Sequence, residues 1–203
     1  MIRVAVDGSG GDSVWEEEYW VGHVNTSPTQ PDILTFCHEG PWDLVDNRIW
    51  GLDLNTGHAW PIRPREEDLE KVGHEYWHAD GIHISYHGHK PNGYKFFGQC
   101  RYDGSEVQEY AFPHQTGHIH SNDFERIVGD GGKEIRLWQW NGDGFAGPRA
   151  LCQHRSSMHI QQTHVHPRFS PQGKYVLFTS DVSKYGNVYK VDLPEFESLP
   201  EIH

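Results

Sequence analysis

A repeat with a spacing of 46 residues constrains the fold of this chain more than any other feature of its sequence. His74, His120 and His166 follow one another at this spacing, and each is followed, after a loop, by short apolar runs. A unit of the same layout begins near His23, in the segment GHVNT. Units of roughly 40–50 residues that each hold several short strands are typical of β-propeller blades. We therefore predict an all-β fold made of WD40-like propeller blades.

The repeat divides the chain into about four blade-like units within a single propeller domain. Their approximate boundaries are 19–63, 64–112, 113–155 and 156–203. The chain has 22 Gly and 12 Pro for turns, and 8 Trp, 9 Tyr and 9 Phe for a core. The alternative is a β-sandwich in which the spacing is accidental. Because four units resemble part of a larger ring, we expect either missing N-terminal blades or sheet edges that another copy of the chain completes in a homo-oligomer.

The charge and the cysteines restrict the partners and the compartment. The formal net charge is −12, and no basic stripe or polybasic patch interrupts it, so we expect no nucleic-acid partner and no membrane partner. The three cysteines are far apart and form no CxxC pair, which favours reduced thiols in a cytoplasmic protein. The first residues, MIRVAVDGSGGD, are too short and too polar for a signal peptide.

Histidine is the compositional outlier, with 16 residues spread along the chain. In a propeller, residues at the same position of successive blades converge on one end of the central channel. His118 aligns with His164 in this repeat, and His166 lies on the same side of an extended segment as His164 because side chains repeat with period two. With the amide oxygen of Gln161 they would form a set of three nitrogens and one oxygen, which suits Mn, Fe, Ni or Zn. The alternative is a group of ordinary hydrogen-bonded histidines.

A second set of alternating histidines, in HISYHGH, lies elsewhere in its unit. His83, His87 and His89 fall within a strand and the hairpin loop that follows it, and not at the start of the unit. We therefore expect these three side chains to have structural and not functional roles.

Four segments resemble the oligogalacturonate lyases of polysaccharide lyase family 22. The segments are DILTFCHEGPWDLVDNRIW, GHEYWHADG, GHIHSND and QQTHVHPRFSPQGKYVLFTSD, which together cover most of the chain from about residue 19. The resemblance implies part of a seven-bladed propeller that binds a divalent metal ion, usually Mn²⁺, and cleaves acidic oligosaccharides derived from pectin by β-elimination. The chain is about half as long as members of this family, and it has GHEYW where the family pattern is THEFW.

The resemblance also implies roles for individual residues. The metal ligands of the family fall on His118, Gln161, His164 and His166. The proton-abstracting histidine falls on His74, and the arginine that stabilises charge falls on Arg48. Tyr76, Glu39 and Asp46 are further candidates near the substrate, and Trp77 is a candidate sugar platform beside His74.

These residue types match the chemistry of uronate elimination. The hydrogen at C5 of a galacturonate unit lies α to a carboxylate, so its removal requires a base and a cation that neutralises the carboxylate. Neutral imidazole suits the base, because its pKa is ordinarily about 6.5. Two other functions remain open: a non-catalytic propeller that binds an acidic sugar or a protein partner, and an isomerase or epimerase that acts on a related uronate.

Overall fold

The computed structural model describes residues 1–112 and 116–202. The boundary of the predicted third unit at residue 113, and the end of the fourth at residue 203, lie outside the described residues. The described chain consists of short antiparallel strands, two 3-10 turns and connecting loops. Within these residues, no helix has the length and the apolar character needed to cross a bilayer.

Four sheets account for most of the strands. The first has the order β3-β4-β5-β6, with strands Val21–Thr26, Ile33–His38, Ile49–Asp53 and His58–Arg63. The second contains β7 (Lys71–Trp77), β8 (His83–His89), β9 (Lys95–Arg101) and β10 (Gln108–Ala111). The third contains β11 (Ile119–His120), β12 (Arg126–Gly131), β13 (Glu134–Trp140) and β14 (Phe145–Gln153). The fourth contains β15 (Arg168–Phe169), β16 (Tyr175–Ser180) and β17 (Asn187–Asp192).

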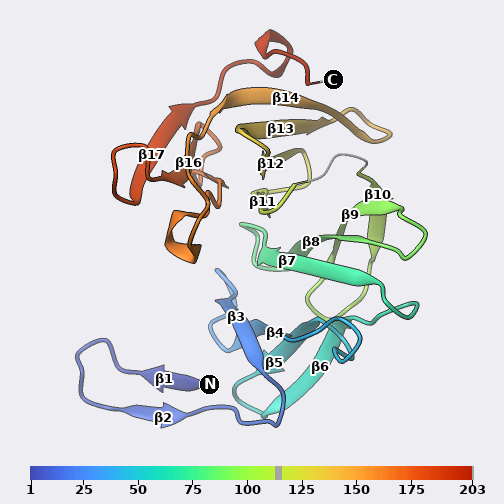
Figure 1. The fold of residues 1–203 in the computed structure, drawn as a ribbon. Coiled ribbons are helices and arrows are strands. Elements are labelled where there is room, and N and C mark those ends of the chain that lie inside the picture. The colour runs from blue at the N-terminus through green and yellow to red at the C-terminus, as the bar shows by residue number, and fades with distance from the viewer. Residues whose placement is uncertain (113–115, 203) are drawn as a thin grey trace.

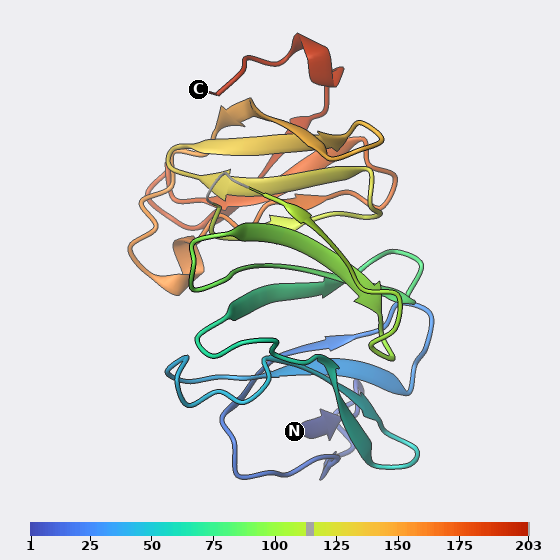
Figure 2. The ribbon, with the colours of Figure 1, turned by 90° about the vertical axis from the view of Figure 1, so that its right-hand side faces the viewer.

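The remaining elements are small. A separate hairpin pairs β1 (Ile2–Val4) with β2 (Gly11–Ser13), and two 3-10 turns, η1 (Gln161–Thr163) and η2 (Phe196–Ser198), flank the fourth sheet. Figure 1 shows the four sheets following one another around a common centre, with β3, β7 and β11 on the inner side. Turned by 90°, the same sheets form successive layers between the two ends of the chain (Figure 2). The predicted all-β fold, with four propeller-like blades, is confirmed.

Neighbouring blades pack through apolar residues that alternate along the strands. In β9, Phe96 packs with residues of the first sheet, whereas the next residue, Phe97, packs with residues of the third. In β13, Leu137 and Trp138 divide in the same way between the fourth and the second sheets. Successive side chains of a strand point to opposite faces, so a strand buried on both faces reads as a continuous apolar run. This packing fixes each blade against its neighbours and so fixes the inner strands around the centre.

Candidate metal centre and active site

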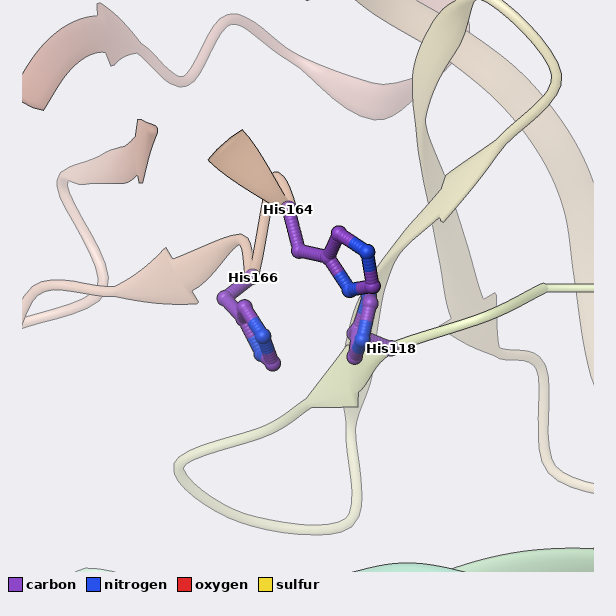
Figure 3. Close-up of side chains that lie close together, drawn as sticks. All are labelled: His118, His164 and His166. Carbon is purple, nitrogen blue, oxygen red and sulfur yellow. The ribbon is translucent and has the colours of Figure 1, made fainter. Parts of the chain in front are cut away.

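Three of the predicted ligands meet at the inner side of the third and fourth blades. One ligand atom from each of His118, His164 and His166 lies within 4.8 Å of the others. His118 immediately precedes β11, and the other two occupy the segment between η1 and β15 (Figure 3). The ring centroids of His118 and His166 are 3.7 Å apart, and those of His118 and His164 are 5.4 Å apart. The residues come from adjacent blades, as the repeat predicts.

Three histidines that line one small cavity share an unusual backbone conformation. His23, His74 and His166 all have positive φ values, of 48°, 54° and 41°. A side chain with a β-carbon rarely adopts this left-handed region, and such residues concentrate at functional sites. His23 and His74 each follow a glycine, and each lies in a register shift between the first two strands of its sheet. A bulge of this kind redirects a side chain, here at the same place in two blades.

A buried carboxylate fixes the orientation of His118. The Nδ1 atom of His118 lies 2.5 Å from Oδ2 of Asp130 in β12, and Oδ1 of Asp130 accepts hydrogen bonds from the backbone N–H groups of His118 and Gly117. Burial would raise the pKa of Asp130, but these bonds hold it below its ordinary value, so the carboxylate is ionised. With Nδ1–H donated to Asp130, the Nε2 lone pair of His118 is free to bind a metal ion.

The other two histidines also fit a metal ion. The Nδ1 atom of His164 is buried and has no hydrogen-bond partner, which is a costly arrangement unless a ligand satisfies it. Burial and the neighbouring His118 lower the pKa of His166 to about 4, so its imidazole is neutral and has a lone pair at neutral pH. Three imidazole donors suit a divalent transition metal with open positions for water or substrate.

Gln161 is the fourth predicted ligand. It begins η1, and its side chain is exposed. Its backbone carbonyl accepts a hydrogen bond from the N–H of His164, so the turn holds the histidine segment in place. The ligand role of Gln161 stays a prediction.

The predicted base, His74, contacts a histidine that we expected to be structural. Its Nδ1 atom lies 2.8 Å from Nε2 of His87 in β8, and its ring centroid lies 5.0 Å from that of His118. Burial, followed by the nearby His87 and His118, lowers the pKa of His74 to about 3, so the ring is neutral. When His74 donates its Nδ1–H to His87, its Nε2 lone pair is free to accept a proton. We expected His87 to be structural and away from the start of its unit, yet the register shift between Gly73 and Tyr76 in β7 accompanies a direct contact between the two rings.

Arg48 lies between two carboxylates. Its guanidinium donates to both oxygens of Glu39, at 2.8 and 3.3 Å, and its Nε atom lies 3.8 Å from Oε2 of Glu75. Burial alone would lower the pKa of Arg48, but Glu75 and then Glu39 raise it, so the guanidinium keeps its charge. The ring of Trp42 lies 5.6 Å from the guanidinium carbon. The side chain is therefore held in one orientation.

Glu75 is the most unusual carboxylate of the site. Its side chain is fully buried, neither of its oxygens has a hydrogen-bond partner, and burial raises its pKa. It lines a small cavity of about 130 Å³ together with His23, His74, His118 and His166. Donor atoms of His23, Cys37 and Glu39 also lie close together. That group suits a metal ion poorly, because burial raises the pKa of the Cys37 thiol and Glu39 is paired with Arg48.

Two predicted substrate contacts are buried. Trp77 is 8% exposed and packs in the core between the first two blades, so a role for Trp77 as a sugar platform is wrong. Tyr76 is 4% exposed and borders the small cavity, and its hydroxyl lies 2.7 Å from that of Ser121. Trp42 instead lines a cavity of about 540 Å³ that also borders Arg48 and His74.

The sequence contained a signal for one of the residues that we missed. The dipeptide Gly-His occurs five times, and three of these occurrences, at 22–23, 73–74 and 117–118, stand near the start of successive units, which aligns His23 with His74 and His118. Asp130 and Glu75 carry no such signal, since each is defined only by what it faces in the fold. Asp46, a candidate helper, instead bonds Nδ1 of the buried His38 at 2.7 Å and so has a structural partner.

Comparisons with known proteins show the family of the chain. The family model described as oligogalacturonate lyase matches residues 1–139, a range that contains Arg48, His74 and His118. The chain is 29% identical to the oligogalacturonide lyase of Pectobacterium atrosepticum and 28% identical to the oligogalacturonate lyase of Dickeya dadantii. Each alignment covers 96% of this chain and 55% of the relative, so the chain spans about half the length of the curated relatives that it matches.

A solved structure shows the same relationship. An oligogalacturonate lyase in complex with manganese superposes with a TM-score of 0.80 and is 26% identical, over 96% of this chain and 54% of that one. The oligogalacturonate lyase of Vibrio parahaemolyticus matches equally well, with a TM-score of 0.80 and 27% identity. Since the family model covers more than half of the sequence, the chain belongs to the oligogalacturonate lyase family.

Proposed function

We propose that this protein binds a divalent metal ion, specifically Mn²⁺, and cleaves oligogalacturonides by β-elimination. The observation that carries the proposal is the 5.0 Å separation of the His74 and His118 rings, because it puts a proton acceptor and a cluster of metal-binding donors beside one cavity. The family of the chain and the manganese complex of a similar lyase support the same assignment.

The metal ligands in this proposal are His118, His164 and His166. Gln161, exposed at the start of η1, is added as a fourth ligand. When bound, the ion supplies a Lewis acid for the uronate carboxylate. Asp130 keeps the Nε2 atom of His118 available for the ion.

The residues of the chain perform the remaining steps. Arg48 binds the substrate carboxylate and offsets the charge that develops there, which requires it to share or exchange its contacts with Glu39. The Nε2 atom of His74 takes the C5 proton. The electron pair of the C5–H bond forms the C4–C5 double bond, the C4–O4 bond breaks, and O4 leaves with the departing sugar and takes a proton from water. His87 keeps the Nδ1–H of His74 hydrogen-bonded.

The test is turnover of trigalacturonate by the chain in the presence of Mn²⁺. We expect the ultraviolet absorbance of an unsaturated uronate to appear, and His74→Ala to reduce its rate by about 10²–10⁴-fold, the contribution of a positioned base. The exposed His159→Ala variant is the matched control. Sugar binding without product would instead identify a binding module, and a product of unchanged mass would identify an isomerase or epimerase.

A further inference from the structure

A row of basic side chains crosses the second blade beside the candidate active site. Lys71 in β7 pairs with His89 in β8, and His89 pairs with Lys95 in β9. Residues directly opposite one another in antiparallel strands project from the same face of the sheet. The three side chains therefore form one row, which we call the basic row.

The basic row lies one step outward from the proposed catalytic pair. His87 and His89 are two positions apart in β8, so their side chains point to the same face, about 7 Å apart along the strand. Since Nε2 of His87 contacts His74, the basic row and the proposed base share one face of one sheet. The open cavity of about 540 Å³ is bordered by all five basic side chains of the two groups, together with Arg48 and Trp42.

The charged side chains that line the cavity are basic, in contrast to the acidic chain as a whole. The chain as a whole has 29 acidic and 17 Lys and Arg residues. No Asp or Glu is among the described residues that line this cavity, whereas Arg48, Lys71 and Lys95 all line it. Within the described part of the chain, neither lysine takes part in an ion pair. A negatively charged protein attracts an anionic ligand only where local cations reverse its field, and this cavity is such a place.

We infer that the basic row is a subsite for the carboxylate of the second uronate unit, the neighbour of the unit that loses its C5 proton. This inference rests on the proposed function. An oligogalacturonide carries one carboxylate on each sugar, and Arg48 and the histidine cluster serve only the first. Lys71 and Lys95 neutralise the next carboxylate, and Trp42, half-buried at the cavity wall, packs against the sugar ring. The subsite selects substrates with charge on adjacent units.

The inference is tested by binding to the inactive His74→Ala chain with Mn²⁺ present, measured by calorimetry with galacturonate and digalacturonate. Lys71→Met and Lys95→Met, combined, retain most of the aliphatic stem and remove the charge. We expect affinity for digalacturonate to fall at least tenfold and affinity for galacturonate to change less than twofold. Lys133→Met is the control for charge, since Lys133 is exposed in a turn of the third blade.

Equal losses for the two sugars, or no loss for either, would overturn the subsite. Turnover by the wild-type chain separates this result from the proposed function. If wild type cleaves trigalacturonate and the double lysine variant keeps its KM, the subsite fails and the lyase assignment stands. If wild type gives no product while digalacturonate binding depends on the lysines, the lyase assignment fails and the subsite stands.

Discussion

The Nδ1 atom of His74 lies 2.8 Å from Nε2 of His87, and the two residues come from neighbouring strands of one sheet. Burial is the largest cause that lowers the pKa of both rings, to about 3 for His74 and to about 4 for His87. The pair is therefore neutral at neutral pH, and one N–H lies between the two nitrogens. This relationship leads to the first prediction.

Replacing His87 with Phe should slow turnover without weakening substrate binding. His74 would lose the acceptor that fixes its tautomer, so we expect kcat to fall roughly 10–100-fold and KM to change less than threefold. The measurement is steady-state kinetics on trigalacturonate with Mn²⁺. His159→Phe, at an exposed position, is the control. A proportional rise of KM with unchanged kcat would show that His87 serves binding instead.

Asp130→Asn should weaken metal binding. The amide keeps one oxygen for the backbone N–H groups of Gly117 and His118, but it no longer accepts the Nδ1–H of His118 as a carboxylate does. Loss of such a partner typically lowers metal affinity about 10–100-fold. The measurement is Mn²⁺ titration by calorimetry, with Asp143→Asn in an exposed turn as the control. Unchanged affinity in Asp130→Asn would exclude this support of His118.

Metal binding should stabilise the fold, because the three histidines belong to two blades. A ligand that binds only the folded state at about 100 times its dissociation constant adds about 2.7 kcal/mol to the free energy of unfolding. We expect urea denaturation to shift by about that amount with saturating Mn²⁺, and His166→Ala to lose most of the shift. A shift that persists in His166→Ala would locate the ion elsewhere.

The free energy of unfolding should decrease as pH falls below about 6.5, in part through His78. Burial lowers the pKa of His78 to about 4, against the effects of Asp80 and Asp123, while the nearby His83 lowers it further. As the pH falls, the imidazole of His78 therefore binds a proton near pH 6.5 in the unfolded chain but only near about pH 4 in the folded chain. The contribution lost between these values is roughly 3 kcal/mol.

The measurement for His78 is the urea midpoint between pH 7.5 and pH 5 in about equal steps. His78→Gln keeps a polar partner for the Ser85 hydroxyl, which lies 2.5 Å from Nε2 of His78, and should show a shallower dependence on pH. The exposed His58→Gln variant is the matched control. An identical slope in wild type and His78→Gln would contradict the assignment.

The fold and the histidine cluster were predictable because both depend on the repeat. A fixed spacing puts His118 and His164 at the same place in successive blades, whatever the details of the loops between them. The apolar runs that pack on both faces, such as Phe96 with Phe97, are equally visible in the sequence. The spacing of the repeat in the sequence therefore predicts which histidines adjacent blades bring together.

Partners that depend on local register were not predictable. The positions of Val72 and Trp77 differ by an odd number, so regular alternation would put them on opposite faces, yet both pack in the same core cluster because the bulge between Gly73 and Tyr76 interrupts the alternation. Counting by twos along β7 therefore gives the wrong face for Trp77. His74 lies within the same bulge and contacts His87, and the pattern HISYHGH does not predict that contact.

The position of His118 on one blade and of His164 and His166 on the next has a kinetic consequence. Any ion coordinated by all three spans the seam between two layers of the molecule. The residence time of the ion is then limited by how long the two blades remain packed against each other. The exchange rate of isotopically labelled manganese would therefore measure how often adjacent blades separate.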